Sequence, residues 1–285
     1  MNKVVIFGTG LIGGSFALAL RKAGAVREVV GFGRSRATLG EALRLKILDR
    51  IGEDAAREVA TADLVLVATP VAQMGEIFAR IAPHLGAAAL VTDGGSTKGD
   101  VVAAARANLG ARLAQFVPAH PIAGAEHSGP AAARADLYQG KRVVLTRLPE
   151  NSDAAVARVQ RAWEQCGAAV SHLTPEQHDE VFAAVSHLPH LLSFALVHDL
   201  AQRQNRDLLL SFAASGFRDF TRIAASSPEM WRDISLANRD ALLREVRQYA
   251  DELYVLYQAL ERSDAAKLEQ IFSEAQKVRA NWKQQ

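Results

Sequence analysis

The sequence predicts an α/β protein in which a doubly wound domain comes first and an all-helical domain follows. Three observations support this prediction. Short apolar runs alternate with helical patterns over residues 1–173, a glycine-rich turn directly follows the first run, and no convincing strand pattern occurs from residue 174 onward. We therefore expect residues 1–173 to form one domain and residues 174–285 to form a second, helical one.

The apolar runs of the first domain are expected to be strands of a buried sheet. Several of them are continuous rather than alternating, which is typical of parallel strands that are covered on both faces. The helical patterns between them suit right-handed crossovers. The expected strands are Lys3–Phe7, Glu28–Phe32, Leu64–Ala68, Ala89–Thr92, Phe116–Pro118, Arg142–Thr146 and Ala169–Leu173.

The second domain opens with a helix-start pattern. Thr174 is a candidate N-cap, Pro175 suits the first helical position, and Gln177 has the spacing of a capping box. Further on, apolar residues recur at intervals of three and four, as on one face of a helix. We expect a second copy of the chain to bury part of this surface, which predicts a homodimer through the helical domain. The recurring residues are Leu188, Leu191, Leu192, Ala195, Leu196, Leu242, Leu243, Val246, Tyr249, Leu253, Leu256 and Leu260.

Composition narrows the class of protein. The 285 residues include 33 basic and 31 acidic side chains, so the formal net charge of +2 gives no general attraction to nucleic acid. No stretch approaches the roughly 20 apolar residues of a membrane span, and we recognise no targeting segment, so we expect no membrane association. The single cysteine, Cys166, leaves no intrachain disulfide and fits a reducing cytoplasm.

The glycine-rich turn Gly8-Thr9-Gly10-Leu11-Ile12-Gly13 lies between the first strand and the first helix, which is the context that a GxGxxG motif requires. Gly8 permits a tight turn, Gly10 lets a diphosphate approach the backbone, and Gly13 lets helix and strand pack closely. The diphosphate then accepts hydrogen bonds from the helix N-terminus. A turn without a ligand is the alternative. The motif predicts a Rossmann-like domain that binds a nicotinamide dinucleotide.

The end of the second strand bears on which dinucleotide is bound. An acid about 20 residues past the motif normally contacts the ribose hydroxyls of NAD. Gly33 stands in that place, and Arg34, Ser35 and Arg36 follow it, which suits a 2′-phosphate. We expect NADP to be preferred and NAD to be possible; the alternative is a solvated basic turn that tolerates either. The predicted cofactor-binding residues are Gly8, Thr9, Gly10, Leu11, Ile12, Gly13, Gly33, Arg34, Ser35, Arg36, Thr69 and Pro70.

Further stretches carry polar side chains that chemistry can use. Thr92–Lys98 and His120–Glu126 each follow an expected strand, so they lie at the carboxyl edge of the sheet, where ligands bind. Ser186–His190, Gly216–Ile223 and Met230–Asp233 lie in the helical domain. Together with the glycine turn, these stretches contain GTGLIGGS, TDGGSTK, HPIAGAEHSG, SHLPH, SGFRDFTRIA and MWRDI. Six motifs in this order make the chain similar to the prephenate/arogenate dehydrogenase family from end to end.

The resemblance implies oxidative decarboxylation of prephenate or arogenate, with hydride transfer to NAD(P)+, in tyrosine biosynthesis. The hydride leaves the ring carbon that carries the hydroxyl, and a base takes or polarises the hydroxyl proton. Loss of the ring carboxylate then gives an aromatic ring, so the step is strongly downhill. Prephenate and arogenate differ only in a keto or amino group distant from the hydride site, and both are retained as candidates.

His120 is the predicted base, because histidine titrates near neutrality and the resemblance gives this role to the histidine of the motif. A structural histidine in a turn is the alternative. Ser96 is expected to hydrogen-bond His120 or the substrate hydroxyl, or to cap the helix ahead of Lys98. The resemblance implies that His190 contacts substrate, with a packed helix histidine as the alternative, whereas His187 is expected to be structural.

Arg222 is the predicted clamp for a substrate carboxylate. It is expected to be a buried arginine that needs an anionic partner, with an ion pair to Asp219 or Asp233 as the alternative. The resemblance implies that Glu126 approaches the site. Trp231 is expected in the core or at a dimer contact, but the resemblance places it near substrate from the partner subunit, so it is retained as a substrate-binding candidate.

Two other functions are considered. A β-hydroxyacid dehydrogenase has a similar domain order, but its catalytic lysine lies in the helical part, and no lysine occurs between Lys141 and Lys267. A non-catalytic NADP-sensing protein on the same fold is the second alternative, and the presence of His120 and Arg222 counts against it. His187 and His190 have no accompanying acid cluster, so we expect no metal site.

Overall fold

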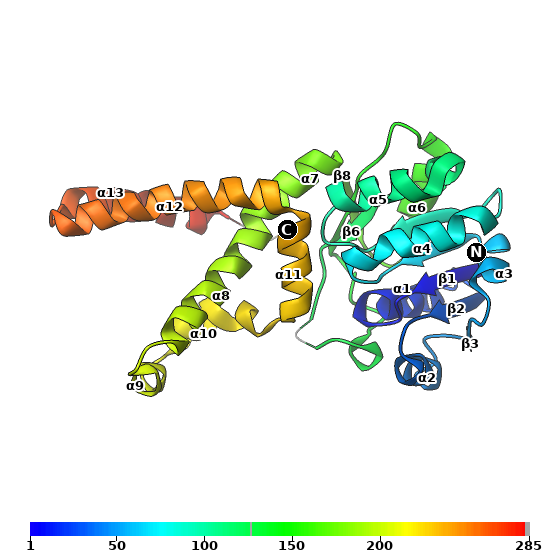
Figure 1. Ribbon diagram of the computed structural model, residues 1–285, viewed down its shortest axis with the longest axis horizontal. Coiled ribbons are helices and arrows are strands. Elements are labelled where there is room, and N and C mark those ends of the chain that lie inside the picture. Colours follow the sequence, from blue (N-terminus) through cyan, green and yellow to red (C-terminus); the bar gives the residue numbers. More distant parts are fainter. Residues whose placement is uncertain (126, 283–285) are drawn as a thin grey trace. The chain divides into compact units, whose positions relative to one another are not determined.

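The computed structural model describes residues 1–125 and 127–282, which form two compact units, Met1–Arg239 and Asp240–Gln285. The larger unit is built on a five-stranded parallel sheet (Figure 1). From edge to edge, its strands are β3 (Arg50–Ile51), β2 (Glu28–Phe32), β1 (Lys3–Phe7), β4 (Leu64–Val67) and β5 (Leu90–Asp93). The chain changes direction across the sheet between β1 and β4, which makes this the topological switch point.

Helices cover both faces of this sheet. Along β1, Val4 and Ile6 belong to one buried hydrophobic cluster, and Val5 and Phe7 belong to another. Because alternate residues of a strand point to opposite faces, the two clusters are the cores above and below the sheet. This arrangement confirms the predicted doubly wound fold. The helices that connect the strands are α1 (Leu11–Lys22), α2 (Arg36–Arg44), α3 (Ala55–Ala60), α4 (Met74–Ile81) and α5 (Gly99–Leu109).

A second sheet corrects one predicted strand. It contains β6 (Ala119–Pro121), β7 (Arg142–Leu145) and β8 (Ala169–His172), and β6 runs antiparallel to β7. The predicted strand Phe116–Pro118 is wrong. It makes a single bridge, between Phe116 and Val91 of β5, and the strand starts three residues later. Pro118 has no N–H to continue the ladder, so the chain moves over to pair with β7 instead.

Other strand predictions hold closely. Strands β1 and β2 have the predicted bounds, and β4, β5, β7 and β8 begin or end within one residue of them. The two-residue strand β3 was not predicted. Helix α6 (Asp153–Gln165) joins β7 to the parallel strand β8.

The rest of the larger unit is helical. Helix α7 (Pro175–Phe182) continues through a π turn, η5 (Ala183–His187), into α8 (Leu188–Ala201). The predicted capping box is confirmed: Gln177 N donates to Thr174 Oγ1 over 3.1 Å, and Thr174 N donates to Gln177 Oε1 over 3.0 Å. The elements α9 (Arg206–Ser211), α10 (Ser215–Thr221), the short turn η6 (Arg222–Ala225) and α11 (Pro228–Ala237) follow. From residue 174 to residue 282 the structure contains no strand, as predicted, whereas the exact domain boundary at residue 173 stays a prediction.

The run Pro175–Ala201 corrects the expectation that no segment has the character of a membrane span. By length and composition it is apolar enough to cross a membrane, with a mean hydropathy of 1.4 in its most apolar window. One such helix is weak evidence for a membrane protein, because a packed helix of a globular protein meets the same criterion. This run also carries His178 and His187, which are buried inside the protein.

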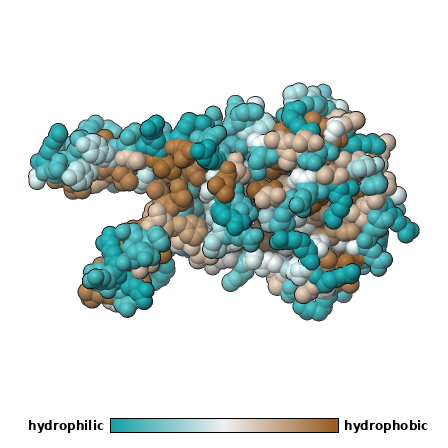
Figure 2. Space-filling model, in the orientation of Figure 1, coloured by the Kyte–Doolittle hydropathy of each residue, from teal (hydrophilic) through white to brown (hydrophobic). Residues whose placement is uncertain are grey.

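The smaller unit is a helical hairpin of α12 (Arg239–Glu261) and α13 (Ala265–Asn281). Asp264 caps α13 by accepting a hydrogen bond from Lys267 N over 2.9 Å. Apolar side chains gather along the hairpin (Figure 2), and several are half-exposed or more, including Leu253, Tyr254, Leu260, Phe272 and Val278. A contiguous apolar surface of this kind is rare on a monomer and typical of an interface.

Candidate active site

The carboxyl ends of β1 and β2, together with the loop after β4, border a cleft of about 540 Å³ at the switch point. Ligands of doubly wound sheets bind in this position. Its lining residues are Phe7, Gly8, Phe32, Gly33, Arg34, Thr69, Gln73, Glu76, Ile77 and Arg80.

The glycine turn beside this cleft fits a dinucleotide. Gly8 has a φ of +94°, and a Cβ there would lie 2.4 Å from the Ala68 carbonyl oxygen. A Cβ on Gly13 would lie 2.0 Å from the Gly8 carbonyl oxygen, whereas Gly10 has no neighbour closer than 4.0 Å. Helix α1 has no side-chain cap, so its first N–H groups are open to a diphosphate. Thr69 Oγ1 is buried without a partner in the described part of the chain.

The residues after β2 divide into two groups. Gly33 and Arg34 line the cleft. Ser35 instead caps α2, since its hydroxyl accepts from Thr38 N over 3.2 Å, and Arg36 is the exposed first residue of that helix. Pro70 precedes a short 3-10 turn, Val71–Gln73, and does not line the cleft.

Two charged residues of α4 that sequence reasoning missed also line the cleft. The Arg80 guanidinium lies 5.2 Å from the centroid of the Phe7 ring, and Glu76 lies one helical turn before it. Their spacing on a helix carries no signal of a ligand, because a charged helix face is usually solvated.

A buried ion pair ties the loop after β5 to β6. Lys98 and Asp93 are both fully buried, and Lys98 Nζ donates to Asp93 and, over 2.9 Å, to the Ala119 carbonyl oxygen. Asp93 Oδ1 also accepts from Ala119 N over 2.9 Å. A Cβ on Gly94 would meet Ile12 of the glycine turn at 3.0 Å and Pro121 of β6 at 3.9 Å. The glycine turn and β6 are therefore neighbours, with His120 next to Pro121.

His120 lies within β6 rather than after a strand, and its ring joins a network. Its Nδ1 lies 2.7 Å from His178 Nε2, and His178 Nδ1 lies 2.8 Å from Asp179 Oδ1. The Phe182 ring packs against both imidazoles, with centroid distances of 4.9 and 4.5 Å. Neither His178 nor Asp179 was predicted from the sequence. They follow the capped helix start at Thr174, but nothing in the sequence links that helix to β6.

The electrostatic surroundings keep this network in a definite charge state. Burial lowers the pKa of His120 well below 6.5, and the nearby His178 and Lys98 lower it further. Burial and Lys98 also lower the pKa of His178, against the opposing effect of Asp179. For Asp179, burial raises the pKa, but hydrogen bonds from His178 and from the backbone of Gly99 and Lys98 leave it below its ordinary value. At neutral pH both imidazoles are therefore neutral and Asp179 is charged, so His120 can accept a proton.

Ser96 lies half-buried in the loop after β5. In the described residues we find no hydrogen bond from its side chain to His120, whose Nδ1 is engaged by His178. Ser96 does not cap α5 either. Asp179 does so instead, accepting from Lys98 N over 2.8 Å and from Gly99 N over 2.7 Å.

A second group of predicted residues gathers around His190. Its Nδ1 donates to the Ser186 carbonyl oxygen over 2.9 Å, and its ring stacks on Trp231 at 3.6 Å with an interplanar angle of 20°. Trp231 Nε1 is buried and has no partner among the described residues. Burial lowers the pKa of His190, and the positive charge of Arg222 lowers it further, so Arg222 belongs to the same neighbourhood.

The expected burial of Arg222 is wrong for this chain. Arg222 is the exposed first residue of η6, and the preceding Phe220 is itself 48% exposed, so this apolar neighbour does not bury it. Glu126 lies outside the described residues. His187 is buried, with Nδ1 3.1 Å from Asn238 Nδ2, as a structural histidine would be. No group of three metal-ligating side chains occurs in residues 1–125 and 127–282.

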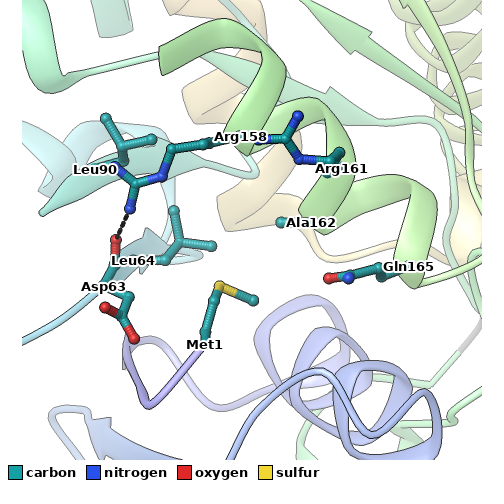
Figure 3. A pocket seen from close by; sticks show the side chains of 8 residues that line it. All are labelled: Met1, Asp63, Leu64, Leu90, Arg158, Arg161, Ala162 and Gln165. Atoms are coloured by element: carbon teal, nitrogen blue, oxygen red, sulfur yellow. Dashed lines mark hydrogen bonds between the residues drawn. The ribbon is translucent and has the colours of Figure 1, made fainter. Parts of the chain in front are cut away.

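Another cavity, of about 220 Å³, lies at the opposite edge of the sheet, where β4 and β5 begin (Figure 3). Arg158 lies across it and donates to the Ala88 carbonyl oxygen over 3.1 Å and to the Asp63 carbonyl oxygen over 3.5 Å. Because ligands of doubly wound sheets bind at the carboxyl edge, this cavity is not the candidate site.

A dinucleotide cleft at the switch point, with a half-buried neutral imidazole on the adjoining strand, defines a dehydrogenase that uses NAD or NADP. Residues 16–172 match the nucleotide-binding domain of prephenate dehydrogenase, and residues 174–274 match the prephenate dehydrogenase dimerization domain. The chain belongs to the prephenate dehydrogenase family.

Individual relatives agree with this assignment. The chain is 35% identical to the cyclohexadienyl dehydrogenase of Zymomonas mobilis, covering 97% of this chain and 94% of that one. It is 37% identical to the prephenate dehydrogenase of Bacillus subtilis, covering 98% and 75% of the two chains. Among solved structures, prephenate dehydrogenase from Aquifex aeolicus in complex with hydroxyphenyl propionate and NAD+ is similar, with a TM-score of 0.91 and 35% identity over 98% of each chain.

Proposed function

We propose that this chain oxidatively decarboxylates prephenate to 4-hydroxyphenylpyruvate, arogenate to tyrosine, or both, and transfers the hydride to NAD(P)+. The observation that carries the proposal is His120, a half-buried imidazole kept neutral by its surroundings, on the strand that adjoins the dinucleotide turn. Membership of the prephenate dehydrogenase family supports the choice of substrates.

In the proposed reaction, NAD(P)+ held at the glycine turn Gly8–Gly13 would supply the acceptor for the hydride that leaves the hydroxyl-bearing ring carbon. His120 accepts the hydroxyl proton, so that the C–O bond becomes a carbonyl. The bond between the ring and its carboxylate then breaks and CO2 leaves. The electron pair of that bond completes the aromatic ring, and the carbonyl oxygen becomes a phenolate that takes the proton back from His120. Ser96, half-buried in the loop after β5, is proposed to hydrogen-bond the substrate hydroxyl.

The residues around His190 are proposed to hold the substrate carboxylates. His190 Nδ1 is fixed by Ser186, which leaves Nε2 to face a ligand, and the Trp231 ring sets the orientation of the imidazole. Arg222 adds a positive charge in the same neighbourhood. The buried, unpartnered Trp231 Nε1 is a further donor for an anionic substrate. Glu126 is retained as a substrate contact on the family resemblance alone.

NADP+ is the proposed preferred cofactor, and NAD+ is a possible one. Gly33 takes the place of the usual ribose-binding acid, and Arg34 and Arg80 line the same cleft. Two cations against the single carboxylate of Glu76 favour a 2′-phosphate over a bare hydroxyl.

A homodimer through the helical part and a cytoplasmic location complete the proposal. The apolar surface of α12 and α13 and the match to a dimerization domain support the dimer. The single, buried Cys166 fits a reducing compartment.

The test is turnover of prephenate and of arogenate with NAD+ and with NADP+, in all four combinations. Reduced cofactor is followed by its absorbance, and the aromatic product by chromatography. We expect stoichiometric formation of both with at least one substrate. A protein that binds NADP+ by calorimetry but turns over neither substrate would be a cofactor-sensing protein, and the proposal would be wrong.

A further inference from the structure

We infer that His178 and Asp179 are positioning residues, which hold His120 in the tautomer with its proton on Nδ1 and so leave Nε2 free to take the proton of the substrate. The inference deepens the function proposed above and rests on His120 being the base. Neither residue needs to touch the substrate to act in this way.

The geometry gives a chain of two side-chain contacts. Asp179 Oδ1 lies 2.8 Å from His178 Nδ1, and His178 Nε2 lies 2.7 Å from His120 Nδ1. A carboxylate only accepts hydrogen bonds, so His178 carries a proton on Nδ1. In neutral His178 the other nitrogen, Nε2, is then an acceptor. Its partner, His120 Nδ1, must therefore be the donor, and the lone pair of His120 is on Nε2.

Asp179 is fixed from the other side. Both of its oxygens accept hydrogen bonds from the N-terminus of α5, with Lys98 N on Oδ1 and Gly99 N on Oδ2. The positive end of that helix favours a charged carboxylate, which cannot rotate without leaving both N–H groups unpartnered. In addition, Asn238 Nδ2 donates to the Asp179 carbonyl oxygen over 2.8 Å. The start of the chain of contacts is thus anchored to the sheet domain.

One other protonation state would reverse the direction of the hydrogen bond between His178 and His120. If His178 were protonated on both nitrogens, its Nε2 would donate to His120 Nδ1, and the proton of His120 would be on Nε2. The charges around the pair act against this state. The buried ammonium of Lys98 opposes a second positive charge, and burial does so as well, whereas Asp179 and Asp93 favour it. The charge of His187 would also act on His120, but burial lowers the pKa of His187 to about 4, which keeps it neutral.

The first test is the tautomer of His120 in the intact protein, with and without NADP+. Histidine is labelled with ¹⁵N, and the His120 signals are assigned by their loss in His120→Asn. We expect a protonated Nδ1 and an unprotonated Nε2 at pH 8, where Nε2 is recognised by its coupling to both ring protons. The opposite tautomer would overturn the inference.

The second test is kinetic and uses two variants of His178. His178→Leu removes the acceptor, so kcat should fall about ten- to a hundredfold, as for a lost buried hydrogen bond, with little change in substrate KM. The His120 proton should move in part to Nε2. His178→Gln keeps an acceptor oxygen and should recover most of the kcat and the original tautomer.

Controls separate positioning from a structural role. His172→Asn removes an exposed imidazole that contacts Gln160 and lies outside the network, and should leave the His120 nitrogen signals unchanged. If His178→Leu fails to fold, the wild-type spectrum and the His178→Gln variant still show whether His178 sets the tautomer of His120. If His178→Leu keeps both kcat and the tautomer, the inference is wrong. If instead His120→Asn keeps its kcat, it is the proposed base that is wrong, whatever tautomer the spectrum shows.

Discussion

The dinucleotide cleft and the His120 network lie at neighbouring strand ends but are built in opposite ways. The cleft depends on the backbone. A positive φ at Gly8, a close approach at Gly13 and the open N–H groups of α1 come from six consecutive residues. The His120 network depends on side chains from β6 and α7 that are 58 residues apart. The first kind of site is encoded by a short motif, whereas the second exists only once the chain has folded.

His120→Asn is expected to have the largest effect, because it should abolish most of the catalysis without changing the dinucleotide cleft. Without the base, kcat should fall by about two to four orders of magnitude, while cofactor affinity is retained. In the wild type, kcat/KM should rise with pH through an ionisation below 6.5, since burial lowers the pKa of His120, and this limb should be absent from the variant. Steady-state kinetics across pH measure both effects, with the exposed His172→Asn as control. A near-native kcat would place the base elsewhere.

Arg222→Ala should raise the substrate KM about ten- to a hundredfold, the range for a lost charge-assisted hydrogen bond, and leave the cofactor KM unchanged. The expected loss is smaller than for a buried arginine because Arg222 is exposed in this chain. Arg222→Lys should recover part of the affinity, since a point charge cannot reproduce a planar fork. Arg203→Ala, which removes an exposed arginine paired with Asp199, is the matched control. An unchanged substrate KM would show that Arg222 does not bind a substrate carboxylate.

His187 should make the stability of the fold depend on pH without taking part in the chemistry. Burial lowers its pKa to about 4, so the neutral form is favoured by folding. This contribution is present above about pH 6.5 and is lost as pH falls toward 4. His187→Gln should reduce the pH slope of the unfolding free energy by about 1.4 kcal/mol per pH unit in that window. Denaturant titrations at several pH values measure the slope, and an unchanged slope would contradict the expectation.

The smallest effect is expected at the cofactor cleft. Arg34→Ala should raise the KM for NADP+ about three- to tenfold, as for an exposed charge–phosphate contact, and leave the KM for NAD+ nearly the same. Glu76→Gln removes the carboxylate that lines the same cleft, and this change should not weaken the binding of NADP+. If the wild type uses NAD+ as well as or better than NADP+, the proposed preference is wrong.

The features that sequence reasoning placed correctly depend on local interactions. The glycine turn, the bounds of β1 and β2, and the capping box at Thr174 each follow from residues within a few positions of one another. A steric limit at a glycine or a cap at a helix start needs no knowledge of the rest of the chain.

The features that it missed depend on distant parts of the chain. Pro118 moves the strand to Ala119, which places His120 inside β6, and the antiparallel partner of β6 lies more than 20 residues away. His178 acquires its meaning only by contact with β6. The exposure of Arg222 could not be inferred from its apolar neighbour, because Phe220 is itself half-exposed.

The π turn at Ala183–His187 has a consequence for helical phase. It precedes Pro189, which has no N–H for a regular α-helical bond. His178 and His190 are twelve residues apart. In an unbroken α-helix, the two residues would lie about 120° apart around the helix axis. A π turn takes up one extra residue, so the angle between the two histidines around the helix axis falls to about 20°. Deleting one residue within the turn should therefore keep the two histidines in phase. Straightening the turn at constant length should instead rotate His190 by about 100°, although every site residue is still present.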